Sequence, residues 1–195
     1  IINDLKKEHP MSRLLEGDVG SGKTAVAAAA SYAVVSSRIK SMRTGDTANS
    51  RLQVAYMAPT EILAKQHYES FVKLFKNLPI NIGLLTGSGC KKFPSKSALQ
   101  TQKFGTDIYK NQLLKWIASG DISIVIGTHA LIQKSVVFKD LAFVIIDEQH
   151  RFGVDQRSKL VSGSDIAPHL LVMSATPIPR TAAMLFFGDL KNTLI

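Results

Sequence analysis

The chain has 195 residues, of which 45% are hydrophobic and 20% are charged, the balance of a folded domain rather than of a disordered chain. Cys90 is the single cysteine, which excludes an internal disulfide and a cysteine-based zinc site and favours a reducing compartment. The formal net charge of +9 favours a polyanionic partner, either nucleic acid or an anionic membrane surface, although a solvated basic surface explains the charge equally well.

The chain shows no membrane-spanning or targeting pattern in its sequence. The longest apolar stretch, residues 25–35, is interrupted by Ser31 and is much shorter than the roughly 20 residues that a membrane span needs. The N-terminus lacks the pattern of a signal peptide. Because the chain starts without Met and without an obvious domain edge, we expect it to be part of a longer protein.

Short β-like runs alternate with helical patterns, which is typical of a parallel sheet covered by helices. Apolar and β-branched runs predict strands at residues 13–16, 52–58, 80–85, 122–126, 142–146 and 170–173. Helical patterns cover residues 23–37, 60–78 and 108–119, the last stopped by Gly120. Two polar, basic stretches are expected to be loops, at residues 38–51 and 87–105.

The helix after Pro59 is predicted from an N-cap at Thr60 and from an apolar stripe. Spacings of three and four place the stripe on one buried face, formed by Leu63, His67, Phe71, Leu74, Phe75 and Leu78. His67 is therefore expected to be a core residue. Trp116, on the helix 108–119, is expected to serve in packing rather than in base stacking. Cys90 lies in a predicted polar loop.

Residues 17–24, GDVGSGKT, match the pattern G-x-x-x-x-G-K-[ST] at every fixed position, between a predicted strand and a predicted helix. Glycines let backbone N–H groups turn toward a phosphate, and the helix N-terminus adds partial positive charge. Lys23 is expected to reach the β- and γ-phosphates, and the Thr24 hydroxyl to bind Mg²⁺. The alternative, a chance glycine-rich turn, is disfavoured by the complete match. The candidate nucleotide-binding residues are Gly17, Asp18, Val19, Gly20, Ser21, Gly22, Lys23 and Thr24.

Two acids, Asp147 and Glu148, follow the predicted strand 142–146. Asp147 can hold Mg²⁺ opposite Thr24, and Glu148 is a natural general base for an attacking water. Their alternative role is to cap the following loop. Because ligands of open α/β sheets bind outside the carboxyl ends of the strands, the two motifs are expected to form one site for a nucleoside triphosphate and Mg²⁺.

Further strings resemble the motifs of superfamily 2 helicases. They are MAPTEILA (57–64, motif Ia), TGS (86–88, Ib), IGTH (126–129, Ic), DEQH (147–150, II) and SAT (174–176, III). Three longer strings, GDVGSGKT, DEQHRFGVDQR and SATPIPRT, resemble the RecG family of ATP-dependent DNA helicases, which act on stalled forks and Holliday junctions in DNA repair and recombination. The related transcription–repair coupling factors typically have Phe in place of Ser21 and Glu in place of Gln149.

The resemblance implies a P-loop NTPase fold of the RecA-like type, an α/β three-layer sandwich with a mostly parallel sheet. It places residues 1–188 in the first of two motor domains and residues 189–195 at the start of a linker to an absent second one. It also implies ATP and Mg²⁺ as cofactors. The implied partners are branched or double-stranded DNA and the second RecA-like domain, for a monomer in the bacterial cytoplasm, at the nucleoid and without a membrane.

The resemblance further implies roles for single residues. Gln149 and His150 would sense the γ-phosphate, so that the candidate catalytic set is Lys23, Asp147, Glu148, Gln149 and His150. Ser174 and Thr176 would couple hydrolysis to domain movement. Four residues would follow the DNA backbone, namely Thr60, Thr86, Gly87 and Thr128. Helix capping and turn formation remain the alternative explanations for Thr60 and Thr128.

Alternatives to a motor ATPase remain open. A GTPase should contain the string [NT]-K-x-D, which does not occur, and a small-molecule kinase would not need SAT after the acidic strand. A chain of this extent could instead bind nucleotide and DNA without turnover, because the family's arginine finger comes from the second motor domain. We therefore expect weak ATP binding and very slow hydrolysis. The basic loops 38–51 and 89–105 look longer than is usual in the RecG family. The second, close to residues 86–88, is either solvated or adds phosphate contacts.

Overall fold

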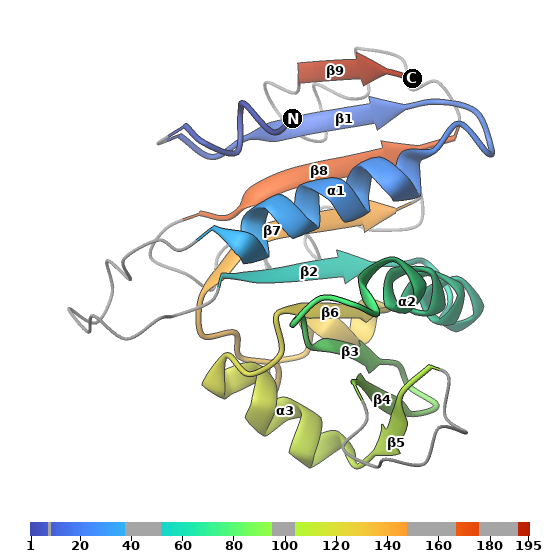
Figure 1. Cartoon of the computed structure of the whole chain (residues 1–195), viewed down its shortest axis with the longest axis vertical. Helices are drawn as coiled ribbons and strands as arrows, with labels where there is room; N and C mark the ends of the chain where they lie inside the picture. The colour runs from blue at the N-terminus through green and yellow to red at the C-terminus, as the bar shows by residue number, and fades with distance from the viewer. Residues whose placement is uncertain (8, 38–51, 95–103, 148–166, 176–190) are drawn as a thin grey trace.

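The computed structural model describes residues 1–7, 9–37, 52–94, 104–147, 167–175 and 191–195. Within these ranges nine strands form one sheet in the order β5-β4-β3-β6-β2-β7-β8-β1-β9 (Figure 1). The strands are β1 (Ser12–Glu16), β2 (Gln53–Met57), β3 (Ile82–Leu85), β4 (Cys90–Phe93), β5 (Thr106–Ile108), β6 (Ile124–Gly127), β7 (Leu141–Asp147), β8 (His169–Ser174) and β9 (Lys191–Leu194). The helices are α1 (Lys23–Ser36), α2 (Glu61–Phe75), α3 (Lys110–Ser119) and the short 3₁₀ helix η1 (His129–Ile132).

Helices cover both faces of the sheet, so that two cores lie on its opposite sides. Successive residues of a strand point to opposite faces. Tyr56 accordingly packs in the core beneath α1 and α2, whereas Met57 packs beneath α3 and η1. Figure 1 shows α1 crossing the sheet near β7 and β8. Six of the eight strand pairings among the described residues are parallel, which confirms the predicted three-layer α/β sandwich with a mostly parallel sheet. None of the described helices is long and apolar enough to cross a membrane.

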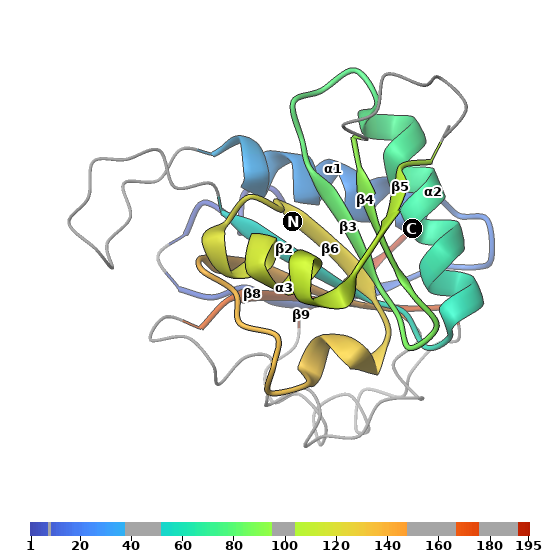
Figure 2. The same ribbon diagram turned by 90° about the horizontal axis from the view of Figure 1, so that it is seen from below.

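An antiparallel extension, β4 and β5, widens the sheet beside β3 and lies at the end that faces the viewer in Figure 2. The prediction of one loop over 87–105 is therefore wrong for β4, and residues 95–103 lie outside the described ranges. The four residues of β4, CKKF, carry two adjacent lysines and no alternating pattern, so they lack the usual sequence signal of a strand. Cys90 is buried rather than in a polar loop, and this burial raises the pKa of its thiol.

Helix α2 begins as predicted but buries a different face. The Thr60 hydroxyl oxygen accepts a hydrogen bond from the Leu63 backbone N–H at 3.2 Å, which confirms the N-cap. Leu74, which was expected in the core, is 56% exposed. The buried residues are Ala64, Tyr68, Phe71, Val72 and Phe75. Two overlapping sets of residues fit the spacing of three and four along this helix, one that begins at Leu63 and one that begins at Ala64. The set that begins at Ala64 faces the sheet.

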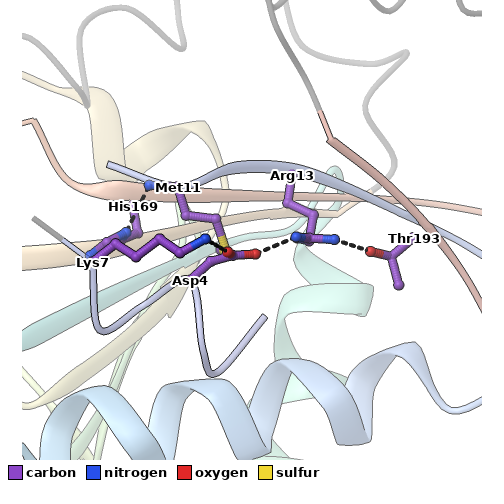
Figure 3. Close-up of polar contacts among 6 residues, drawn as sticks. All are labelled: Asp4, Lys7, Met11, Arg13, His169 and Thr193. Atoms are coloured by element: carbon purple, nitrogen blue, oxygen red, sulfur yellow. Dashed lines mark hydrogen bonds and ion pairs between the residues drawn. The ribbon is translucent and has the colours of Figure 1, made fainter. Parts of the chain in front are cut away.

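Hydrogen bonds between charged and polar side chains connect the segment before β1 to the sheet (Figure 3). The Asp4 carboxylate accepts hydrogen bonds from Lys7, at 2.7 Å, and from Arg13. These bonds hold the pKa of Asp4 well below its usual value. Arg13, on β1, also donates to the Thr193 hydroxyl on β9 at 2.5 Å. This cluster joins the N-terminal segment to β1 and β9, while a linker role for residues 189–195 stays a prediction.

Gln53, the first residue of β2, is fully buried and contacts four backbone groups. Its amide nitrogen donates to the carbonyl oxygens of Ile117, at 3.0 Å, and Ile122, at 2.8 Å. Its amide oxygen accepts from the N–H groups of Lys139, at 2.8 Å, and Asp140, at 3.1 Å. One side chain therefore ties the centre of the sheet to the end of α3 and to the segment before β7.

Gln53→Leu is expected to destabilise the fold strongly, because it keeps the side-chain volume but removes four hydrogen bonds. We expect the free energy of unfolding, measured by urea denaturation, to fall by about 3 kcal/mol or more, since each buried group left unpaired costs roughly 1–3 kcal/mol. Gln66→Leu on the exposed side of α2 is the matched control and should change stability by no more than about 0.5 kcal/mol. Equal effects of the two substitutions would refute this role of Gln53.

Candidate active site

The parallel strands end at one edge of the sheet, and the predicted motifs follow their carboxyl ends. A pocket of about 550 Å³ lies there. The loop after β1 and the start of α1 contribute Val19, Gly20, Gly22, Lys23 and Thr24. The segment after β2 and helix α2 contribute Pro59, Thr60, Leu63 and His67, and Asp147 ends β7 beside them. The structure thus brings the glycine-rich loop and Asp147 to one pocket.

The loop between β1 and α1 has the backbone geometry of an anion-binding turn. Gly20 and Gly22 adopt φ angles of +85° and +95°, in the left-handed region where residues with a Cβ are strained. Gly22 is the N-cap of α1, so the first N–H groups of a 14-residue helix, which have no partner within the helix, lie beside the pocket. A helix start of this kind suits a phosphate group.

Lys23 folds its side chain back over this loop. Its ammonium group donates to the carbonyl oxygens of Gly17, at 2.5 Å, and Asp18, at 2.8 Å. The Gly17 N–H donates in turn to the carbonyl oxygen of Ser174, at 3.3 Å. The start of the loop is therefore joined by a backbone hydrogen bond to the end of β8, where the predicted coupling residue Ser174 is buried.

Asp147 is 8% exposed. Its carboxylate contacts two side chains, those of Tyr56 and His67. The Tyr56 hydroxyl donates to Asp147 Oδ2 at 3.3 Å. Burial, together with the charge of Asp147, raises the pKa of Tyr56, while a hydrogen bond with Thr24 acts in the opposite direction. Tyr56 is thus a neutral donor to Asp147, one of the proposed ligands of Mg²⁺.

His67 is not a core residue, which corrects the prediction made from its place on the apolar stripe. It lines the pocket, and its Nε2 atom lies 2.7 Å from Asp147 Oδ2. Two features of the sequence agree with the positions of His67 and Tyr56, although neither identifies Asp147 as their partner. Thr60, Leu63 and His67 follow the spacing i, i+3, i+7, so His67 shares the helix face of the N-cap. A tyrosine within a buried strand also needs a partner for its hydroxyl.

The four predicted DNA contacts lie after β2, β3 and β6. Thr60 caps α2 and lines the pocket. Thr86 and Thr128 are 3% and 2% exposed, and their hydroxyls are used within the chain. Thr86 donates to the Gly89 carbonyl at 2.9 Å, and Thr128 caps η1. Gly87 is exposed. A role in DNA binding stays a prediction for all four residues.

Several predicted residues and segments lie outside the described ranges. They are Glu148, Gln149, His150 and Thr176, together with the basic stretches 38–51 and 95–103. Their roles stay predictions.

The pocket fits a nucleotide with Mg²⁺. Thr24 supplies a hydroxyl and Asp147 a carboxylate, the oxygen donors that Mg²⁺ prefers.

The whole chain is similar to known proteins. The model of the DEAD/DEAH box helicase family matches residues 1–185. The ATP-dependent DNA helicase RecG of Aquifex aeolicus is 48% identical over 100% of this chain and 21% of that protein. RecG of Streptococcus pneumoniae is 46% identical over 100% of this chain and 24% of that protein. The chain thus spans less than a third of these relatives.

Solved structures show the same fold. A structure of RecG bound to a three-way DNA junction has a TM-score of 0.67 at 39% identity, and the match covers 98% of this chain and 22% of that one. A DEAD box protein from Methanococcus jannaschii has a TM-score of 0.61 at 20% identity, over 99% of this chain and 46% of that one. These matches confirm the RecA-like fold. The chain belongs to the DEAD/DEAH box helicase family, and nearly all of its 195 residues are similar to one segment of RecG.

Proposed function

We propose that this chain is the first RecA-like motor domain of an ATP-dependent translocase that acts on branched or double-stranded DNA. The observation that carries the proposal is the pocket in which Lys23 and Thr24 lie together with Asp147. The similarity to RecG, one structure of which contains a three-way DNA junction, supports DNA as the substrate. The net charge of +9 also suits a polyanion.

In this proposal the triphosphate of ATP binds against the N-terminus of α1. Lys23 leaves the carbonyls of Gly17 and Asp18 and neutralises charge on the β- and γ-phosphates. Thr24 and Asp147 would hold Mg²⁺, which supplies positive charge to the phosphate oxygens as negative charge builds up on them. Glu148 accepts a proton from the attacking water.

Hydrolysis is then coupled to movement of a second RecA-like domain, the other proposed partner. Gln149 and His150 sense the γ-phosphate, and Ser174 and Thr176 transmit its loss. The backbone bond between Gly17 and Ser174 supports this route, because it links the phosphate loop directly to the strand end that carries the coupling residues. The protein works as a monomer, in the cytoplasm and at the nucleoid.

The second candidate function is a module that binds nucleotide and DNA without turnover. This candidate is favoured for the chain by itself, because the chain spans 21% of the Aquifex aeolicus relative and in the family the arginine finger belongs to the second motor domain. A related alternative is the motor of a transcription–repair coupling factor.

ATP turnover with a three-way DNA junction, measured for the chain and for the full-length protein, tests the proposal. We expect ATP turnover by the full-length protein to be strongly stimulated by DNA. Turnover by the chain should be at least about 1,000-fold slower, because in the family the arginine finger comes from the second motor domain. Comparable DNA-stimulated rates would contradict the dependence on a second domain. A full-length protein whose ATP turnover does not respond to DNA would contradict the translocase itself.

A further inference from the structure

Tyr56 and His67 have no role in the proposed function, yet both contact Asp147. Tyr56 and His67 come from different elements, β2 and α2. Both contact the same oxygen, Oδ2, at 3.3 Å and 2.7 Å respectively. A carboxylate held at one oxygen from two directions cannot rotate freely, so its other oxygen also keeps a fixed direction.

The ring of Tyr56 is locked by its neighbours. Tyr56 is fully buried. Its ring lies against the His67 imidazole, with 4.8 Å between the centroids, and edge-on to Phe71 at 5.5 Å. A ring packed on two sides holds its hydroxyl in one place. That place is beside Asp147, whose Oδ2 atom lies 3.3 Å from the hydroxyl oxygen.

His67 braces the same carboxylate from the helical layer. Its side chain is 13% exposed and lines the pocket, two helical turns after the N-cap Thr60. Its Nε2 atom lies 2.7 Å from Asp147 Oδ2. A buried polar atom is costly unless it has a partner. For His67 Nε2 that partner is the Asp147 carboxylate.

We propose that Tyr56 and His67 are positioning residues that orient the Asp147 carboxylate toward Mg²⁺ and the bound nucleotide. The inference rests on the proposed function, because it assumes that Asp147 is a ligand of the metal. Partners of this kind orient metal ligands, and their loss typically weakens metal binding by about 10- to 100-fold.

The test compares nucleotide binding with and without Mg²⁺. Fluorescence of mant-ADP is titrated with the wild-type protein and with the variants Tyr56→Phe and His67→Phe, which keep an aromatic ring but lose the polar atom. We expect each variant to need about 10-fold more Mg²⁺ for half-maximal tightening of binding, with an unchanged Kd for mant-ADP without metal. His67→Gln, which returns an N–H donor, should recover most of the loss.

Tyr68→Phe is the matched control. Tyr68 is also a buried tyrosine, on α2, but it does not line the pocket, and its hydroxyl has no hydrogen-bond partner in the described structure. It should leave the Mg²⁺ requirement unchanged. Far-UV circular dichroism and urea denaturation establish that each variant is folded.

The outcomes separate the inference from the function on which it rests. A wild-type protein that binds no nucleotide would overturn both. Wild-type binding that tightens with Mg²⁺, together with an unchanged Mg²⁺ requirement in Tyr56→Phe and His67→Phe, would overturn the inference alone. Equal weakening with and without metal would also overturn it, because it would indicate a general structural role.

Discussion

Lys23→Ala is expected to abolish ATP hydrolysis by the full-length protein. The ammonium group is the cation that the loop after β1 brings to the pocket, where the carbonyls of Gly17 and Asp18 hold it. A phosphoryl group in transfer carries negative charge on its oxygens, and an amine fixed in a pocket stabilises that charge without reorganisation. We expect kcat to fall by about 100- to 1,000-fold, as is usual when one such donor is removed.

The measurement is a steady-state ATPase assay that separates kcat from KM. Lys115→Ala, on the exposed side of α3 and outside the pocket, is the matched loss of a lysine and should leave both constants unchanged. A Lys23→Ala protein that keeps more than about a tenth of the wild-type kcat would argue against a role of this lysine at the phosphates.

Glu148→Gln is expected to separate binding from chemistry. The substitution keeps the size of the side chain but removes the base that takes the proton from water, and general-base catalysis typically contributes about 100- to 10,000-fold. ATP hydrolysis should therefore fall by a factor in this range. The affinity for Mg²⁺ and ATP should stay within about twofold of wild type, since a residue that acts only in the transition state contributes little to ground-state binding.

The neighbouring acid provides the contrast for this experiment. Asp147→Asn should weaken binding that depends on Mg²⁺, because it removes charge from a proposed ligand of the metal. Equilibrium binding and single-turnover hydrolysis distinguish the two variants. If Glu148→Gln lost ATP affinity as Asp147→Asn does, both acids would be assigned to the metal, and the base would have to be sought elsewhere.

The sheet and the phosphate loop were predictable because their sequence signals are local. Strands β6 and β7 are apolar runs without alternation, as strands covered on both faces require. The loop at residues 17–24 carries its glycines where the backbone turns. The joint pocket followed from one rule of topology, that parallel strands end at one edge.

The remaining features depend on contacts between distant residues. Strand β4 has little strand propensity in its own sequence, and it is paired on both sides, with β3 and with β5. The apolar residues of α2 are compatible with two different buried faces of the helix. Packing on the sheet selects the face that leaves Leu74 exposed and His67 in the pocket. The contact of Tyr56 with Asp147 joins residues 91 positions apart in the sequence, so no local pattern reveals it.

In the proposed function, the loop around Lys23 and the acid at Asp147 bind one triphosphate and one metal ion. A crystal structure with a non-hydrolysable ATP analogue and Mn²⁺ in place of Mg²⁺ tests it most directly, because the anomalous signal of manganese locates the metal. We predict one manganese peak between the Thr24 hydroxyl and the Asp147 carboxylate, at about 2.1–2.2 Å from their oxygens, with the phosphates against Lys23. A metal or triphosphate bound away from this pocket would contradict the account.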